Sequence, residues 1–485
     1  MVEVMVKMIW IVKMIWIVTV TVLLFSSHTL CTNPGLKVRV TQKALDYGRQ
    51  VGIQVLQQKL REIQIPDVSG STHVPVIGHI QYKITGMRIT DFGLPQSAIA
   101  FSAGTGIKLS IDNAYIHISG NWRVKYHFIS DSGSFDLSVS RLSISEAIGM
   151  TRDATGRPAV HSAGCTANVG SLDITFHGGG SWLYNLFSSS LENPIRSSLN
   201  REICPKVSNA INGLEQHLKN MKISSRIDKY AEIDYSLVNP IAITNTFMDL
   251  DFKGQFYRVG QHKEPPFRPP PVSLSKQAKY MMYLGLSDFF ANSAGFAYYE
   301  AGALRMNITD NMIPKHLPIR LNTSTFGVLI PQVEKLYPNM LILMNLHASR
   351  QPVLKSTSNN ITVQVYGAID TFAILPNSSL APLFVLDIYA SVSAKVAISN
   401  MKLIGSLKLN SLRLSLGRSD VGPFKVDSLQ GILDMAMKIV VLPKINAKLA
   451  NGVPLPHVDH LSFVNPLLQV NQNILVIATD LHYGS

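Results

Sequence analysis

The feature of this sequence that most limits its fold is a proline-rich segment just past the midpoint, His262–Ser273, which reads HKEPPFRPPPVS. Five of the eight residues from Glu264 to Pro271 are proline. Because each proline fixes φ and lacks an amide hydrogen, the segment predicts an extended, semi-rigid connection and excludes a helix or a central strand. The segments on either side of it have similar lengths, and each alternates predicted strands with one long apolar helix near its end. We therefore predict two similar domains joined by a stiff strap, with a linker between unrelated domains as the alternative.

Length and composition agree with two large apolar cores. The 485 residues suit two domains of about 200 residues each. Hydrophobic residues make up 46% of the chain and charged residues only 15%, yet no run of 18 apolar residues follows residue 31. The net charge of +13 favours anionic partners such as a membrane surface or a phosphorylated glycolipid. The basic residues are spread along the chain, which argues against a nucleic-acid-binding arm.

Residues 1–31 have the proportions of a signal peptide. Lys7 and Lys13 precede an apolar run, Met14–Phe25, that is short for a membrane span. A signal anchor is the alternative. Cleavage after Cys31 would leave Cys165 and Cys204, and an even pair of cysteines in a secreted chain predicts one disulfide bond.

Four N-glycosylation sequons also fit a secreted protein. Their asparagines all follow the strap, and they are Asn307, Asn322, Asn360 and Asn377. Their placement suggests that the second domain can carry sugar without blocking function.

The first half is predicted to hold two long helices. Apolar residues recur at steps of three and four in Gln42–Ile63, which predicts an amphipathic helix. Gly48 and Gly52 would leave a shallow groove on its apolar face, suited to an acyl chain; ordinary core packing is the alternative. A second helix is predicted from Ser181 to about Asn220, kinked or divided by its two prolines.

Between these helices the apolar period changes to two, which predicts an antiparallel meander with one solvated face. The segment Asn121–His127 places cations around Trp122 and Tyr126, so it could bind phosphate while the rings lie at a lipid interface. A solvated edge strand protected by charge is the alternative. Turns are predicted at two places, residues 119–121 and 131–133.

The second half repeats the pattern. A short helix broken by Pro331 is predicted within Ser324–Tyr337, and an apolar helix over Asp427–Leu449 that must be buried or line an apolar pocket. A final strand is predicted over Asn471–Tyr483. Other strands are predicted over residues 362–366 and 384–389, and a long ribbon over 395–416.

The sequence contains none of the common catalytic signatures: no nucleophile elbow, HExxH, CxxC, Walker loop or dinucleotide fingerprint. Its fourteen histidines are scattered without metal-ligand spacing. We therefore predict a protein that is not an enzyme, with no metal and no cofactor other than a bound phospholipid.

The chain after residue 31 resembles the family of bactericidal/permeability-increasing protein and lipopolysaccharide-binding protein. The stretches that carry the resemblance are Asn33–Gly35, Gln42–Tyr47, Ile65–Asp67, Ser134–Ser138, Tyr283–Asp288, Asp310–Pro314, Leu375–Ser379 and Val453–Pro456. Together they are highly specific, and the Asn-Pro-Gly start supports cleavage near Cys31.

This resemblance implies an α+β fold: an elongated boomerang of two similar barrels, each a twisted antiparallel sheet wrapped on long helices, joined by a central sheet and the proline-rich linker. It implies one disulfide in the first barrel, which Cys165 and Cys204 match. The expected divisions are a signal peptide over residues 1–31, an N-terminal lipid-binding barrel over 32–250, a linker over 251–275 and a C-terminal lipid-binding barrel over 276–485.

The resemblance also implies two kinds of site. Cations at the tip of the first barrel would bind the phosphates of lipid A, and an apolar pocket in each barrel would take phospholipid acyl chains. The matching tip positions are Arg61, His73 and His79 in one region and Arg123, Lys125 and His127 in another, a less basic set than the bactericidal pattern. The residues expected to line the first pocket are Leu45, Val55, Leu191, Ile195 and Leu199.

The function that these expectations favour is a secreted or granule-stored innate-immune protein that binds lipopolysaccharide at the Gram-negative outer membrane, as a monomer. The alternatives are a lipid-transfer protein of the same fold, which the weak positive charge of the first half favours, and a protein that presents endotoxin to a receptor. Because several tip positions are histidine, binding is expected to strengthen near pH 5.5–6.

Overall fold

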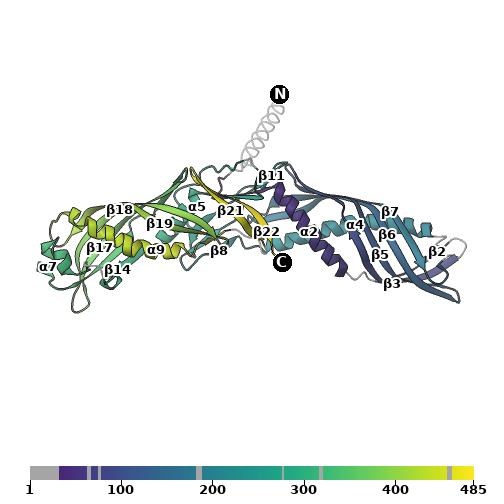
Figure 1. Cartoon of the computed structure of the whole chain (residues 1–485), viewed down its shortest axis with the longest axis horizontal. Helices are drawn as coiled ribbons and strands as arrows, with labels where there is room; N and C mark the ends of the chain where they lie inside the picture. Colours follow the sequence, from purple (N-terminus) through teal and green to yellow (C-terminus); the bar gives the residue numbers. More distant parts are fainter. Residues whose placement is uncertain are drawn as a thin grey trace, which may run out of the picture.

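A computed structural model describes residues 32–62, 67–74, 78–181, 188–275, 278–315, 320–455 and 461–484. The predicted signal peptide lies outside these residues. Within them, some side chains are also not described, among them those of residues 55–62 and 188–191. The molecule is elongated, with one sheet-rich lobe at each end (Figure 1).

A six-stranded antiparallel sheet at the middle of the molecule joins the two halves of the chain. β1 (Leu36–Thr41) pairs on one side with β11 (Phe247–Phe252) and on the other with β13 (Met282–Ser287). The order is completed by β10 (Ala242–Ile243) at one edge and by β22 (Ile474–Tyr483) and β21 (Leu461–Asn471) at the other. Strands from both ends of the chain thus share one sheet, and the expected boundary at residue 250 falls inside β11.

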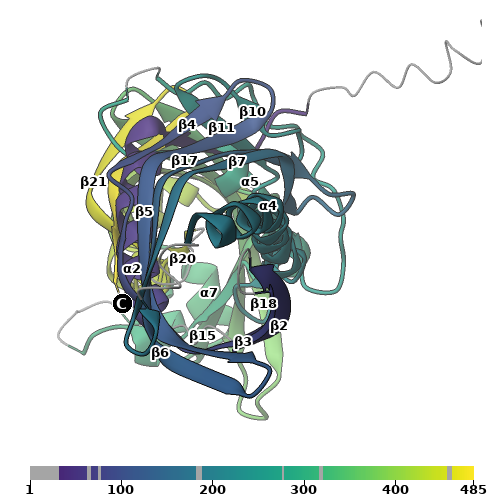
Figure 2. The same cartoon turned by 90° about the vertical axis from the view of Figure 1, so that its right-hand side faces the viewer.

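The first lobe is a long, curled antiparallel sheet. Its strands are β2 (Val68–Val74), β3 (Gly78–Gly93), β4 (Gln96–Ser102), β5 (Gly106–Tyr126), β6 (Ile129–Arg152) and β7 (Pro158–His177). Two long helices accompany it, α2 (Gln42–Glu62) and α4 (Ser188–Lys219). Figure 2 looks along the molecule and shows the sheet curled around α4. The disulfide Cys165–Cys204 joins α4 to β7, as predicted.

The second lobe repeats this plan with different helices. Its sheet contains β14 (Arg305–Ile308), β15 (Leu341–Ala348), β16 (Val353–Thr357), β17 (Asn360–Ile374), β18 (Leu380–Ser399), β19 (Lys402–Ser419) and β20 (Val453–Pro454). Its helical elements are α5 (Asp288–Glu300), η1 (Asp310–Met312), α6 (Thr323–Gly327), α7 (Pro331–Leu336), η2 (Val426–Leu429), α8 (Gln430–Ala436), η3 (Met437–Val441) and α9 (Leu442–Leu449). The α+β fold with two barrels around a central sheet is therefore confirmed.

The predicted helices have nearly the expected ranges. α4 runs through both of its prolines, so the helix is not divided there, and the alternative of a kink stays a prediction. Pro331 separates α6 from α7 as predicted. No helix in the described part of the chain is long and apolar enough to cross a membrane.

The predicted turns are both wrong: residues 119–121 lie inside β5, and residues 131–133 lie inside β6. Gly120 is needed for a close approach: a Cβ there would lie 2.7 Å from the Phe135 ring on the neighbouring strand. The predicted ribbon over 395–416 is a hairpin instead. Asn400 and Met401 both have positive φ and turn β18 into β19.

The proline-rich strap is bound to the middle of the molecule by specific contacts. β12 (Gln255–Arg258) precedes it and pairs with β9 (Ala231–Asp234) in a small sheet that ends in β8 (Ser224–Arg226). Glu264 accepts hydrogen bonds from Gln255 at 2.9 Å, Tyr257 at 2.8 Å and Lys253 at 3.0 Å. Partial burial alone would raise the pKa of Glu264, but these three donors outweigh it and lower the pKa. Phe267 packs edge-on against Phe289 and Phe296 of α5.

Candidate functional site

A strip of three cations crosses the outer face of the first sheet near its far end. In the register of β3 and β5, Lys83 lies opposite Arg123 and Gln81 lies opposite Lys125. Residues directly opposite each other, and those two positions apart along a strand, point to the same side of a sheet. Lys83, Arg123 and Lys125 therefore share one face, where all three are exposed. We call these three residues the cationic strip.

The cationic strip has little internal charge compensation. Lys83 lies 3.7 Å from Asp67, and both side chains are more than half exposed, so this ion pair contributes little. Within the described ranges, no carboxylate lies within ion-pair distance of Arg123 or Lys125. Like charges opposite each other destabilise a sheet. Two cations without a described carboxylate partner, beside a third, can therefore bind an anion such as phosphate.

The inner face of the same strands is a buried apolar core. Trp122, Phe135, Ile174 and Phe176 are buried together beneath the strip. The expectation that the Trp122 ring lies at a lipid interface is therefore wrong, because Trp122 is 2% exposed and alternates with the outward-facing Arg123. The alternative of an edge strand is also wrong, since residues 121–125 of β5 pair with both β3 and β6.

An aromatic side chain that the sequence analysis did not single out lies at the turn from β5 to β6. Phe128 is fully exposed, and it follows His127, whose φ of 47° forms the turn. The Tyr126 ring lies 4.4 Å from that of His127. A phenylalanine ring in this position can contribute apolar contact to a ligand whose charged groups bind the cationic strip. The sequence could have indicated the position of Phe128 beside the cationic strip only if the turn had been predicted at residues 127–128.

Two of the three predicted tip histidines, His73 and His79, lie on the same sheet face as the strip, and the third, His127, lies in the turn after β5. His73 of β2 is directly opposite His79 of β3, and their ring centres are 5.2 Å apart. Both are exposed, and His79 is on the same side as Gln81 and Lys83. The side chain of Arg61 lies outside the described residues. Lys83 was missed by the sequence analysis, although the alternation along Gly78–Gly93 already places it on the polar face with His79.

The predicted pocket residues divide into two groups. Ile195 and Leu199 of α4 are half-buried and pack against Val139, Leu142 and Leu172 of the first sheet. Leu45 of α2 is also half-buried. The side chains of Val55 and Leu191 lie outside the described residues, so the pocket as a whole stays a prediction.

Two glycines leave one side of α2 open. Gly48 and Gly52 are exposed, and a Cβ built at either position would meet nothing within 4 Å. The side of α2 that carries these glycines is therefore uncovered by described residues, and an acyl chain along it stays a prediction.

One carboxyl group lies buried between the first sheet and α4. Glu146 of β6 is opposite Cys165, which is bonded to Cys204 of α4, so the Glu146 side chain also points towards that helix. It is fully buried, and neither carboxylate oxygen has a hydrogen-bond partner. A buried polar group without a partner costs about 1–3 kcal/mol in proteins.

We expect Glu146→Met to stabilise the protein by about 1–3 kcal/mol, because an apolar side chain of similar length removes that cost. Glu202→Met, at an exposed position of α4, is the control and should change the unfolding free energy by less than about 0.5 kcal/mol. Calorimetric unfolding measures both. A fall in stability for Glu146→Met would show that the carboxyl group has a partner in solution.

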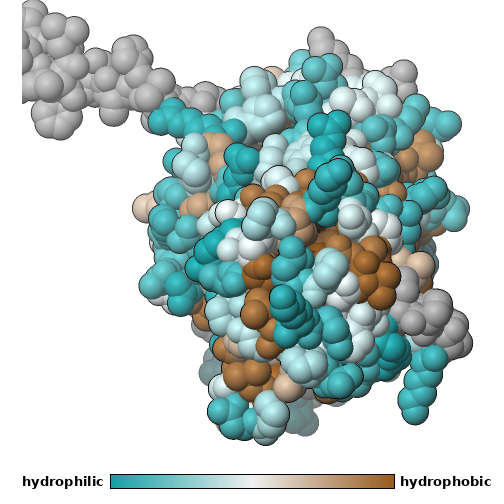
Figure 3. Space-filling model, turned by 90° about the vertical axis from the view of Figure 1, so that its left-hand side faces the viewer, coloured by the Kyte–Doolittle hydropathy of each residue, from teal (hydrophilic) through white to brown (hydrophobic). Residues whose placement is uncertain are grey.

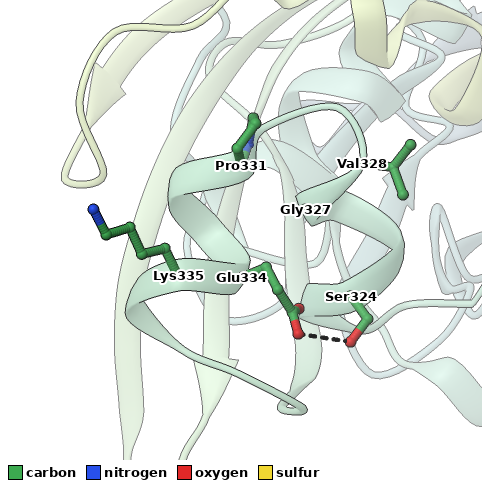
Figure 4. A pocket seen from close by; sticks show the side chains of 6 residues that line it. All are labelled: Ser324, Gly327, Val328, Pro331, Glu334 and Lys335. Carbon is green, nitrogen blue, oxygen red and sulfur yellow. Dashed lines mark hydrogen bonds between the residues drawn. The ribbon is translucent and has the colours of Figure 1, made fainter.

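The far end of the second lobe carries a different surface. A hollow of about 500 Å³ lies between α6 and α7, lined by Ser324, Gly327, Val328, Pro331, Glu334 and Lys335. In Figure 4 the Glu334 carboxylate accepts a hydrogen bond from Ser324 at 3.1 Å, while the Lys335 side chain points away. Hydrophobic residues are scattered among polar ones over this end (Figure 3). The exposed ones include Val328 and Leu336.

Comparison with known proteins identifies the family. Profiles of the N-terminal and C-terminal domains of the LBP / BPI / CETP family match residues 44–221 and 225–483. A bactericidal permeability-increasing protein of Sebastes schlegelii is 47% identical, covering 94% of this chain and 96% of the relative. The human lipopolysaccharide-binding protein is 32% identical, covering 94% of this chain and 95% of the relative. A crystal structure of lipopolysaccharide binding protein covers 93% of this chain and all of that chain, with 31% identity and a TM-score of 0.60. This chain belongs to the LBP / BPI / CETP family.

Proposed function

We propose that this protein is a secreted, non-enzymatic innate-immune protein that binds the lipid A part of lipopolysaccharide at the tip of its first barrel. The observation that carries the proposal is the cationic strip, in which Arg123 and Lys125 have no described carboxylate partner. Relatives named for lipopolysaccharide binding and for bactericidal activity support it.

The geometry suits a ligand that has phosphates and acyl chains close together. Arg123 and Lys125 offer charge-assisted hydrogen bonds to phosphate oxygens, the strong polar interaction available here. Phe128, at the adjoining turn, would enter the acyl layer and contribute apolar burial. The buried core under the strip holds the strands in place, so the cations are positioned before the ligand arrives. Binding in this way would displace the divalent cations that bridge lipid A phosphates, which would weaken the bacterial outer membrane.

Binding to lipid A at several salt concentrations tests the proposal. Because exposed ion pairs are screened by salt, the affinity should fall steadily as ionic strength rises. Dephosphorylated lipid A should bind more weakly and with a smaller salt dependence. Binding that is indifferent both to salt and to the phosphates would contradict recognition by the cationic strip.

The tip histidines predict a pH dependence. Histidine is the side chain whose charge changes near neutral pH. With His73, His79 and His127 at the tip, we expect lipid A to bind more tightly at pH 5.5 than at pH 8. At roughly 0.2–1 kcal/mol for each exposed pair, the combined gain in lipid A affinity should be at least about threefold. Vesicle binding at the two pH values measures it, and equal affinity would contradict the prediction. The triple Asn variant should lose most of the difference.

A phospholipid-transfer function is the second candidate. It is favoured by the open side of α2 at Gly48 and Gly52 and by the half-buried Leu45, Ile195 and Leu199. A bound phospholipid in the first barrel, with acyl chains along these residues, would fit either function. Mass spectrometry of lipid extracted from the secreted protein identifies the occupant. Protein that carries phospholipid but does not bind lipid A would favour transfer and leave the cationic strip as an ordinary solvated surface.

Presentation of endotoxin to a receptor is a third possibility, and the surface of the second lobe would decide it. The four sequon asparagines lie in that lobe, and Asn307, Asn360 and Asn377 are exposed. We expect a glycosylated monomer. Removal of N-glycans followed by light scattering would test both expectations.

A further inference from the structure

Two histidines at the tip of the first barrel form a pair whose geometry the lipid A proposal does not use. His73 and His79 lie directly opposite each other near the ends of β2 and β3, which fixes the separation of their backbones. Their ring centres are 5.2 Å apart, and both side chains are exposed. Neither ring forms a hydrogen bond with another described residue, so their ring nitrogens are available to a ligand.

This separation matches the requirement of a shared metal ion. Imidazole nitrogen binds Zn²⁺ at about 2.0–2.1 Å, and two imidazoles on one tetrahedral ion have ring centres about 5 Å apart. Imidazole is a preferred ligand of Zn²⁺, Cu²⁺ and Ni²⁺, and exposed rings give up little hydrogen bonding to bind them. Small side-chain rotations on a fixed pair of strands would direct one nitrogen of each ring to the same point.

The surroundings of the pair determine what else would bind the metal. No group of three or more His, Cys, Asp or Glu side chains that could hold a metal occurs among the described residues. Among the described residues in register with the pair on the adjoining strands, the charged ones are cations: Lys83 of β3 and Lys125 of β5, with His127 at the next turn. A metal ion held only by two histidines keeps open coordination positions, and its neighbours favour an anionic oxygen in them.

We propose that His73 and His79 bind a divalent transition metal ion, represented by Zn²⁺, whose open positions accept a phosphate oxygen. The metal would add positive charge at the end of the sheet, next to the cationic strip. It would also coordinate the phosphate that the strip binds. The metal site can be tested alone, whereas its role in binding lipid A rests on the proposed function.

Titration of the secreted, full-length protein with Zn²⁺ at pH 7.5 tests the site itself. We expect saturable binding that falls at least tenfold in affinity in His73→Asn/His79→Asn. His482→Asn, at an exposed position on β22, is the matched control and should retain the wild-type affinity for this site. Equal Zn²⁺ binding by the wild type and the double variant, measured by calorimetry with folding checked by circular dichroism, would overturn the proposal.

Lipid A binding with and without Zn²⁺, at constant Mg²⁺, tests the role of the metal. We expect Zn²⁺ to raise the affinity at least threefold in the wild type and in His482→Asn, but not in the double variant or with dephosphorylated lipid A. An equal effect of Zn²⁺ in the double variant would place the ion on the lipid alone and overturn the role proposed for the pair. Lipid A binding that persists without any effect of Zn²⁺ would overturn this inference and leave the proposed function intact.

Discussion

Arg123→Ala/Lys125→Ala should reduce the affinity for lipid A by about thirtyfold at physiological salt, at roughly 1 kcal/mol for each exposed charge-assisted hydrogen bond. These two side chains lie on the outer face of β5, away from the buried core formed by Trp122 and Phe135, so the variant should fold normally. Surface plasmon resonance on immobilised lipid A vesicles measures the change. The salt dependence of binding should fall with the affinity, because two phosphate contacts are lost.

The same strand provides the control for this experiment. Lys108 is also an exposed cation of β5, but it lies at the opposite end of the strand, opposite Ala100 and Ala147. Lys108→Ala changes the net charge without touching the cationic strip and should alter affinity by less than twofold. An equal loss in Lys108→Ala would show that overall charge, rather than the strip, attracts lipid A. Full affinity in the double variant would place the phosphate contacts elsewhere.

Asp249→Ala should destabilise the protein by about 3–5 kcal/mol, because it leaves a buried arginine without its counter-charge. Arg39 of β1 makes two hydrogen bonds of 2.7 Å to the Asp249 carboxylate of β11, and both side chains are 8% exposed. The same guanidinium donates to the carbonyl groups of Leu274 and Ser275, just after the prolines. Loss of Asp249 should therefore lower the melting temperature and loosen the end of the strap together.

Two variants make the stability prediction specific. Asp434→Ala removes an exposed ion pair with Lys438 within one helical turn and should cost less than about 0.5 kcal/mol. Arg39→Met/Asp249→Leu removes both buried charges and should recover most of the loss, because the cost arises from the unpaired charge rather than from the missing bond. Denaturant unfolding compares the three. A small effect of Asp249→Ala would show that water reaches Arg39.

The local features of the chain could be predicted from the sequence because they depend on residues close together along it. The helical period of Gln42–Glu62, the separation of α6 from α7 by Pro331 and the extended strap all follow from backbone geometry and side-chain spacing. The family resemblance added the arrangement of the barrels and a match for the pair Cys165 and Cys204, which the structure joins.

Turns were harder to predict, because glycine occurs both in turns and inside strands where a neighbouring side chain approaches closely. Gly120 resembles a turn residue but lies inside β5, where it makes room for the Phe135 ring. The true turn at His127 and Phe128 contains no glycine or proline. This error assigned Trp122 to an exposed tip, whereas the tertiary structure buries it and exposes Phe128 instead.

The sequence by itself determined the basic character of the chain, its apolar excess, the strap and the polar alternation that carries His79, Arg123 and Lys125. Only the tertiary structure decided which of these residues meet. Strand register brings Lys83 opposite Arg123 and His73 opposite His79, and sheet formation brings Arg39 to Asp249 across 210 positions of the chain. The physical reason is that periodicity fixes which face a side chain takes, whereas its neighbours on that face depend on hydrogen bonds between distant strands.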